Sequence, residues 1–165
     1  MYRNILYPTD GSAGSEAAAE HVRTLASAFD ATVHVLHVID ARHAGLGASG
    51  AFLADEPSAM GDQSAETGYE GMGTAEVDDA VTERAEAVVE EAAAALGDVE
   101  TATAIEVGTP HSAVLRYADD REVDAIVMGT HGRTGVERYL LGSVTEKVVR
   151  MADVPVLTIR RDGVE

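Results

Sequence analysis

The chain has 165 residues, a length that fits one domain of ordinary size. Its 29 Asp and Glu residues against 12 Lys and Arg give a formal net charge of −17. That charge argues against a nucleic-acid binder and against docking on an anionic membrane surface. The chain contains no cysteine, which excludes disulfides and thiolate metal sites. No apolar run reaches transmembrane length and no signal-peptide pattern opens the sequence, so we expect a cytoplasmic protein.

The basic residues are almost all of one type. Lys147 is the single lysine, the other basic residues are Arg, and Ala is abundant. An acidic, lysine-poor and alanine-rich chain is typical of proteins that work in strong salt, where self-repulsion between carboxylates is screened. We therefore predict a halophilic protein, with an ordinary acidic protein as the alternative.

The chain begins with an expected strand, helix and strand. Residues 3–8 form a short apolar run that ends in a Pro-Thr-Asp-Gly turn, which predicts a buried strand. From Ser12 the apolar residues recur at helical spacing as far as Phe29, and Ser12 or Ser15 is the expected N-cap. Residues 31–39 are β-branched and nearly continuous, as in a strand covered on both faces.

Residues 41–76 differ in composition from the rest of the chain. They hold seven of the 16 glycines and six acidic residues, and they show little periodicity. The segment is too long for an ordinary connection inside a compact domain. We expect an inserted loop within a single domain that spans 1–165, because neither side of the segment completes a sheet alone.

The second half continues the alternation of helices and strands. Gly97 is a natural helix stop, and Thr109 followed by Pro110 is a natural helix start. The expected elements are a helix at 77–96, a strand at 100–107, a helix that opens at Thr109, a strand at 124–128, a helix at 143–152 and a strand at 154–160.

Strands that alternate with helices imply right-handed crossovers and a doubly wound, mostly parallel α/β sheet with helices on both faces. Ligands of such sheets bind outside the carboxyl ends of the strands, where the winding direction reverses. The polar and glycine-rich segments that follow strands are therefore the candidates for chemistry, and they are 9–15, 39–45, 108–110 and 129–145.

The segment 129–145 has the features of a phosphate site. Gly129 and Gly132 let the backbone approach a ligand closely, because no Cβ intervenes. Gly142 and the residue after it open a helix, whose free N–H groups and positive dipole end attract anions. It is neither a Walker A loop nor a dinucleotide fingerprint. Side chains that could add hydrogen bonds to a phosphate are Ser143, Thr145 and Arg133.

The spacing Gly129-Thr-His-Gly132, nine residues, Gly142-Ser143 resembles the ATP-binding signature of the universal stress protein family. The resemblance extends over nearly the whole chain. Further matching segments are YPTDGS at 7–12, VGTP at 107–110, VMGTHGRTG at 127–135, LLGSVTEKVV at 140–149 and VPVLTIR at 154–160.

The resemblance implies a five-stranded sheet of order 3-2-1-4-5, bound ATP with Mg²⁺ or Mn²⁺, and a homodimer through the last strand, Val154 to Ile159. It places Pro8, Thr9 and Asp10 beside the ribose and phosphates, with Asp10 as the metal ligand. Val38 would contact the adenine, and Met128 with Gly129 would line the floor. Phosphates would be held by Gly132, Arg133, Gly142, Ser143, Val144 and Thr145, and His131 lies in the same loop.

A nucleotide-dependent regulator in stress response is the leading functional hypothesis. We nominate no catalytic residue, because no positioned base or charge-stabilising group for phosphoryl transfer is evident. The alternatives are a slow ATPase or phosphotransferase and a protein-interaction scaffold with a vestigial nucleotide site. Because molar salt shortens the Debye length to about 3 Å, nucleotide affinity is predicted to hold or improve with salt.

Overall fold

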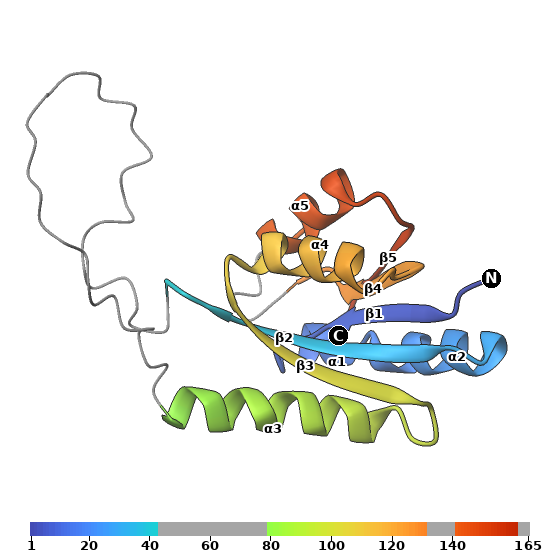
Figure 1. The fold of residues 1–165 in the computed structure, drawn as a ribbon, viewed down its shortest axis with the longest axis horizontal. Helices are drawn as coiled ribbons and strands as arrows, with labels where there is room; N and C mark the ends of the chain where they lie inside the picture. The colour runs from blue at the N-terminus through green and yellow to red at the C-terminus, as the bar shows by residue number, and fades with distance from the viewer. Residues whose placement is uncertain (43–78, 132–140, 162–165) are drawn as a thin grey trace, which may run out of the picture.

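A computed structural model of the protein describes residues 1–42, 79–131 and 141–161 (Figure 1). Strands and helices alternate along the chain, as the sequence predicts. The elements are β1 (Asn4–Pro8), α1 (Ala13–Glu16), α2 (Ala19–Phe29), β2 (Thr32–Asp40), α3 (Asp79–Ala95), β3 (Thr101–Gly108), α4 (Pro110–Asp120), β4 (Ala125–Gly129), α5 (Ser143–Met151) and β5 (Val156–Ile159).

The five strands form one sheet in the order β3-β2-β1-β4-β5, and every neighbouring pair is parallel. This confirms the predicted sheet and its order. The chain winds outward from β1 through β2 to β3, then returns to β4 on the other side of β1 and continues to β5. The winding direction therefore reverses between β1 and β4, which is where doubly wound sheets bind ligands.

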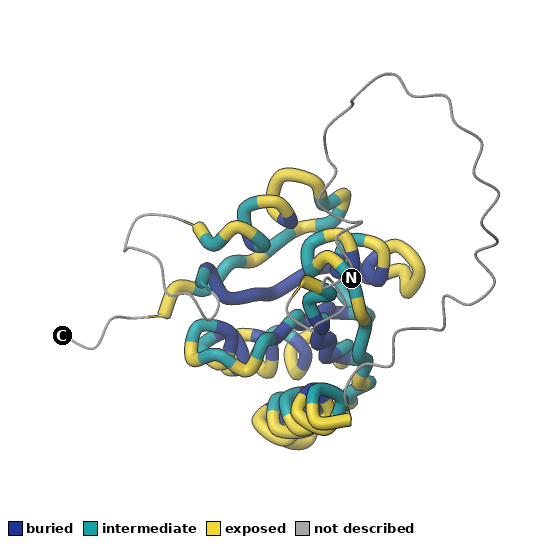
Figure 2. Tube along the Cα trace, turned by 90° about the vertical axis from the view of Figure 1, so that its left-hand side faces the viewer, coloured by how far each residue is buried: buried dark blue, intermediate teal, exposed yellow. Residues whose placement is uncertain are grey.

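Helices cover both faces of the sheet (Figure 1), and the central strands β1, β2 and β4 are the most buried part of the described chain (Figure 2). β4 is buried at all five positions, because it lies inside the sheet under helices on both faces. One core cluster lies on the α2 and α3 face, and its fully buried members include Ile5, Val22, Val33, Val35 and Leu96. The second lies on the α4 and α5 face, and its members include Leu6, Leu36, Val114, Ile126 and Val148.

The first predicted helix is divided in two. Ser12 is the N-cap of α1, and its side chain accepts a hydrogen bond from the Ser15 amide. The Ser15 carbonyl accepts hydrogen bonds from the Ala18 amide and from the Tyr7 hydroxyl. The Ser15 carbonyl thus takes part in a tighter turn and in a hydrogen bond from β1. The regular α-helical hydrogen-bond pattern begins again only at α2.

Smaller differences lie at the ends of elements. Phe29, predicted on the apolar helix face, is 41% exposed and packs edge-to-face on Tyr2 at a ring distance of 5.1 Å. Thr109 takes the N-cap position of α4 without making a side-chain cap bond. The predicted insertion at 41–76 lies outside the described residues from position 43 onward. Within the described ranges, no helix is both long and apolar enough to cross a membrane.

Candidate functional site

The turn after β1 is held by hydrogen bonds among its own polar groups. The Asp10 carboxylate accepts a hydrogen bond from the Ser12 amide at 2.9 Å. The Thr9 and Ser15 hydroxyl oxygens lie 3.0 Å apart, and the Tyr7 hydroxyl donates to the Ser15 carbonyl at 2.8 Å. These bonds fix the position of Asp10 at the carboxyl edge of the sheet from both the strand side and the helix side.

Burial separates the predicted residues of this turn. Thr9 is 6% exposed, its hydroxyl accepts from the Gly11 amide, and its carbonyl lies 2.8 Å from Nδ1 of the buried His37. A carbonyl oxygen can only accept, so Nδ1 of His37 carries the proton. Tyr7 is 1% exposed, and burial raises the pKa of its hydroxyl to about 12. Thr9 is thus a structural residue of the turn, while Asp10 is partly exposed and carries the charge.

The end of β4 lies against α1 with almost no space between the two backbones. A Cβ atom at Gly129 would lie 2.2 Å from the Gly14 carbonyl oxygen. A Cβ atom at Gly14 would lie 2.1 Å from the His131 carbonyl oxygen. The space that Gly129 leaves is therefore filled by the backbone of α1. Sequence reasoning named Gly129 and did not single out Gly14, whose signal is the run of small residues from Gly11 to Ser15.

The N-terminus of α5 is attached to the same segment of β4. The Thr145 hydroxyl donates to the Gly129 carbonyl at 2.9 Å, and the Gly142 amide donates to the Thr130 carbonyl at 2.7 Å. Gly142 is the N-cap, and as a glycine it supplies no side-chain cap bond. Ser143 is exposed and does not act as a cap. The first amides of α5 thus lie at the carboxyl edge of the sheet, and the N-cap residue supplies no side-chain acceptor for them.

The structure refines the roles expected of the α5 residues. Thr145 is 4% exposed, and its proton is donated to the Gly129 carbonyl. Its hydroxyl therefore positions α5 on β4. Ser143 and the half-buried Val144 belong to the first turn of α5, where their amides point toward the N-terminal end of the helix.

Two predicted apolar residues lie on one face of the sheet. Met128 of β4 is 6% exposed and belongs to the core cluster on the α4 and α5 face. Val38 of β2 is half-buried and packs against the same cluster. Pro8, at the end of β1, is half-buried on the strand between them in the sheet.

His131 has one ring nitrogen engaged and one without a partner. Its Nδ1 lies 2.8 Å from the Thr130 hydroxyl, and its Nε2 is buried with no hydrogen-bond partner among the described residues. Two other predicted residues, Gly132 and Arg133, lie outside the described part of the chain. In the ranges that the structure describes, no group of three His, Asp or Glu side chains could hold a metal ion.

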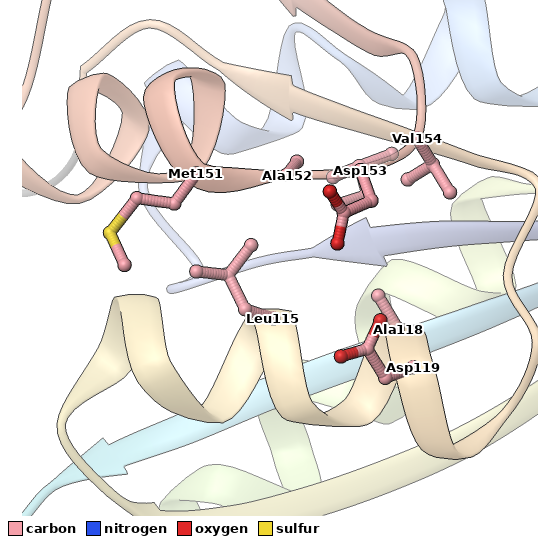
Figure 3. Close-up of a pocket in the computed structure, with 8 residues that line it drawn as sticks. Leu115, Ala118, Asp119, Met151, Ala152, Asp153 and Val154 are labelled. Carbon is pink, nitrogen blue, oxygen red and sulfur yellow. The ribbon is translucent and has the colours of Figure 1, made fainter.

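A small cavity lies away from these residues, between α4 and the connection from α5 to β5 (Figure 3). It encloses about 30 Å³, room for about two water molecules. Its lining includes Leu115, Asp119, Met151 and Asp153. Because Asp153 precedes β5, the cavity lies toward the amino ends of the strands and is too small for a nucleotide.

The parallel sheet, its switch point between β1 and β4, and the open helix N-terminus beside it define a doubly wound α/β domain of the kind that binds anionic ligands. The sequence profile of the universal stress protein family matches residues 1–160, and the chain belongs to this family.

A similar curated relative is the universal stress protein MJ0577 of Methanocaldococcus jannaschii. It is 36% identical over 171 residues, which cover 98% of this chain and 96% of the relative. The solved structure of MJ0577 superimposes with a TM-score of 0.75 at 33% identity, and the match covers 99% of both chains.

Two solved universal stress proteins carry adenine nucleotides. One, in complex with cAMP, has a TM-score of 0.57 at 21% identity and covers 96% of this chain and 98% of its own. The other, from Archaeoglobus fulgidus in complex with dAMP, has a TM-score of 0.58 at 19% identity, with the same coverage of both chains. At these identities the likeness is one of fold.

Proposed function

We propose that this protein is an ATP-binding universal stress protein that acts as a nucleotide-dependent regulator in stress response. The observation that carries the proposal is the α5 N-terminus, which begins at a glycine N-cap and which Thr145 and Gly142 attach to the end of β4. Backbone N–H groups and the positive end of the helix dipole together favour a bound phosphate. Asp10, in the turn after the neighbouring strand β1, is the residue proposed to hold a metal ion.

The fold relatives support an adenine nucleotide as the ligand class. Two members of the family hold cAMP and dAMP on the same fold. In this chain Val38 and Met128 offer the apolar contacts for a base, because they share one face of the sheet beside the switch point. Gly132, Arg133 and His131 complete the proposed set, together with the amides of Ser143 and Val144.

Mg²⁺ or Mn²⁺ is proposed to bind through the phosphates. Such hard cations use one or two carboxylates together with phosphate oxygens and water, and they do not require a cage of protein ligands. Asp10 fits this role, because its carboxylate sits at the strand edge and the Ser12 amide orients it. A bound metal would supply positive charge that offsets the charge of the phosphates, and Asp10 would hold it.

The proposed partner is a second copy of the chain. β5 is the edge strand of the sheet, paired with β4 alone in the described structure. Leu157 on β5 is 43% exposed, and Val149 and Met151 on the preceding helix are 44% and 57% exposed. An edge strand with apolar neighbours favours pairing with another chain. Pro155 lacks an amide proton, so pairing is expected from Val156 to Ile159.

Mass spectrometry of ligand released from the pure protein, together with titration calorimetry of ATP in molar KCl with Mg²⁺, tests the proposal. Wild-type protein is expected to bind ATP. Ser143→Glu places a carboxylate at the helix N-terminus, and we expect it to weaken ATP binding at least about tenfold. Ser27→Glu, an exposed serine on α2, is the matched control and should bind as wild type does.

Three outcomes separate the alternatives. Absence of ATP binding in the wild-type chain would contradict the proposal and favour the scaffold with a vestigial site. Single-turnover release of ADP that Asp10→Ala abolishes would favour the slow ATPase or phosphotransferase. Equal ATP affinity in Ser143→Glu and wild type would show that the N-terminus of α5 is not part of the binding site.

A further inference from the structure

The tightest backbone contact near the proposed site joins α1 to the segment that leaves β4. A Cβ at Gly14 would lie 2.1 Å from the His131 carbonyl oxygen, and one at Gly129 would lie 2.2 Å from the Gly14 carbonyl oxygen. Both distances are far below the 3.0 Å that real Cβ atoms respect. Because the opposing atoms are backbone, they cannot rotate away as the end of a side chain can.

We infer that Gly14 is a positioning residue for the nucleotide site, an inference that rests on the proposed function. α1 cannot retreat to accept a larger residue, because Ser15 is bonded to Tyr7 and Thr9 at the end of β1. Ser15 is itself 5% exposed. A methyl group at Gly14 therefore pushes on the backbone at His131.

The displaced backbone is the one that carries the binding groups. The Gly129 carbonyl receives the Thr145 hydroxyl, and the Thr130 carbonyl receives the Gly142 amide. Moving this short segment therefore moves the open N-terminus of α5. It also moves the His131 ring, whose Nδ1 is bonded to Thr130 and whose Nε2 is buried without a partner among the described residues.

Gly14 acts through these groups, since it has no side chain to offer a ligand. A hydrogen bond to a charged group loses most of its value when donor and acceptor are misaligned. The short gap between α1 and β4 thus sets where the phosphate-binding amides lie. Sequence motifs centred on the glycine loop do not include this residue.

The test is the ATP dissociation constant of Gly14→Ala, measured with Mg²⁺ by calorimetry at a temperature where circular dichroism shows the variant folded. We expect affinity about tenfold weaker than wild type, the equivalent of one charge-assisted hydrogen bond. Ala13→Ser adds one heavy atom at the exposed neighbouring position and should stay within about twofold of wild type.

A purely structural role would lower the melting temperature and leave the dissociation constant of the folded protein unchanged. A folded Gly14→Ala protein that binds ATP as tightly as wild type would therefore overturn the inference. The double variant Gly14→Ala with His131→Ala adds a second readout. If Gly14 acts through the His131 segment, the two losses in affinity are less than additive, and full additivity would contradict that route.

Hydrogen exchange in the wild-type chain gives a measurement that needs no variant. The Ala17 and Ala18 amides, just after α1, donate to the Ala13 and Ser15 carbonyls of α1, and neither amide is among the proposed ligand contacts. Saturating ATP should slow their exchange, because α1 and the β4 end are in direct backbone contact, and unchanged exchange would overturn the inference. A wild-type chain that binds no ATP at all would instead contradict the proposed function.

Discussion

The two ends of the sheet are closed in different ways. At the amino end, the Asp124 carboxylate accepts hydrogen bonds from the Arg3 and Asn4 amides at 2.7 and 2.9 Å. His34 lies between the Tyr117 hydroxyl at 3.1 Å and the Asn4 side chain at 3.4 Å. Side chains of the protein itself thus satisfy the polar groups of this end.

At the carboxyl end, side chains such as Asp10, Ser15 and Thr145 also make hydrogen bonds, but some polar groups beside them have no partner among the described residues. α5 begins at a glycine N-cap that supplies no side-chain acceptor, and Nε2 of His131 has no partner within the described chain. Buried polar groups in folded proteins are nearly always hydrogen-bonded, so groups left open gather where a ligand can complete them. The comparison assigns ligand binding to the carboxyl end and not to the amino end, and the predictions below test that division.

Thr145→Val should have the largest effect. The two side chains have nearly the same shape, but valine cannot donate to the Gly129 carbonyl, and Thr145 is 4% exposed. Leaving a buried acceptor short of a donor costs about 1–3 kcal/mol of unfolding free energy. ATP affinity should fall as well, because the attachment of α5 to β4 is lost. Urea unfolding and calorimetry measure the two effects.

Thr24→Val is the matched control for that change. The Thr24 hydroxyl also donates to a backbone carbonyl, that of Glu20 at 2.8 Å, but on the exposed surface of α2. Water replaces that bond, so the variant should lie within about 0.5 kcal/mol of wild type and bind ATP normally. Equal losses in both variants would show that the carboxyl end has no special role.

Tyr7→Phe should have the next largest effect. It removes the donor to the Ser15 carbonyl and is expected to cost about 1 kcal/mol. Burial raises the pKa of Tyr7 to about 12, above its ordinary value of about 10. Between these values the unfolded chain ionises first, so wild-type stability falls as the pH rises from about 10 to about 12. In a series of melting curves the phenylalanine variant should lose less stability over this range, because it lacks the Tyr7 share and keeps that of Tyr117, whose pKa burial also raises.

The sequence predicts the strands well, because their apolar runs are local and continuous. β4 is expected at 124–128 and is found at Ala125–Gly129, buried throughout. It predicts the division of the first helix poorly, because that break depends on the Tyr7 hydroxyl, which reaches the Ser15 carbonyl from the neighbouring strand. A contact between elements leaves no periodic signal in either segment.

For the candidate site, too, the sequence predicts the local motifs but not the contacts between elements. The glycine spacing points to the end of β4 and the start of α5, and both lie together in the structure. Gly14 could not be found from spacing, because its role depends on how closely α1 approaches His131. Nor does the sequence show that the Thr145 hydroxyl donates to a backbone carbonyl inside the protein while Ser143 is exposed.

Asp124→Asn should have a smaller effect, a loss of stability that is present at neutral pH and disappears in strong acid. Hydrogen bonds from the Asn4 amide and then the Arg3 amide hold the pKa of this carboxyl below its ordinary range. A lowered folded pKa gives stability that is present above about pH 4 and lost as the pH falls through the folded pKa. Because the carboxylate is partly exposed, we expect less than about 1 kcal/mol.

Thermal melts between neutral and strongly acidic pH check this prediction. Wild type and Asp124→Asn should differ at neutral pH and converge in strong acid. The lowered pKa of His34, caused by burial and then by Arg121, removes stability from both proteins below about pH 6.5, so it cancels in the difference. ATP affinity at neutral pH should be unchanged, since Asp124 lies at the other end of the sheet, and a loss of affinity would break the division between the two ends.

The smallest expected effect is that of salt on ATP binding. The protein has a net charge of −17, so in dilute buffer its long-range field repels an anionic nucleotide. The Debye length falls from about 10 Å at about 0.1 M to about 3 Å at about 1 M salt, so distant carboxylates are screened while amides and metal in contact with phosphate are not. Affinity measured by calorimetry across this range, at saturating Mg²⁺, should therefore hold or improve. A steep fall would mean that distant positive charges hold the nucleotide, and the open end of α5 would then be the wrong place to look for its binding energy.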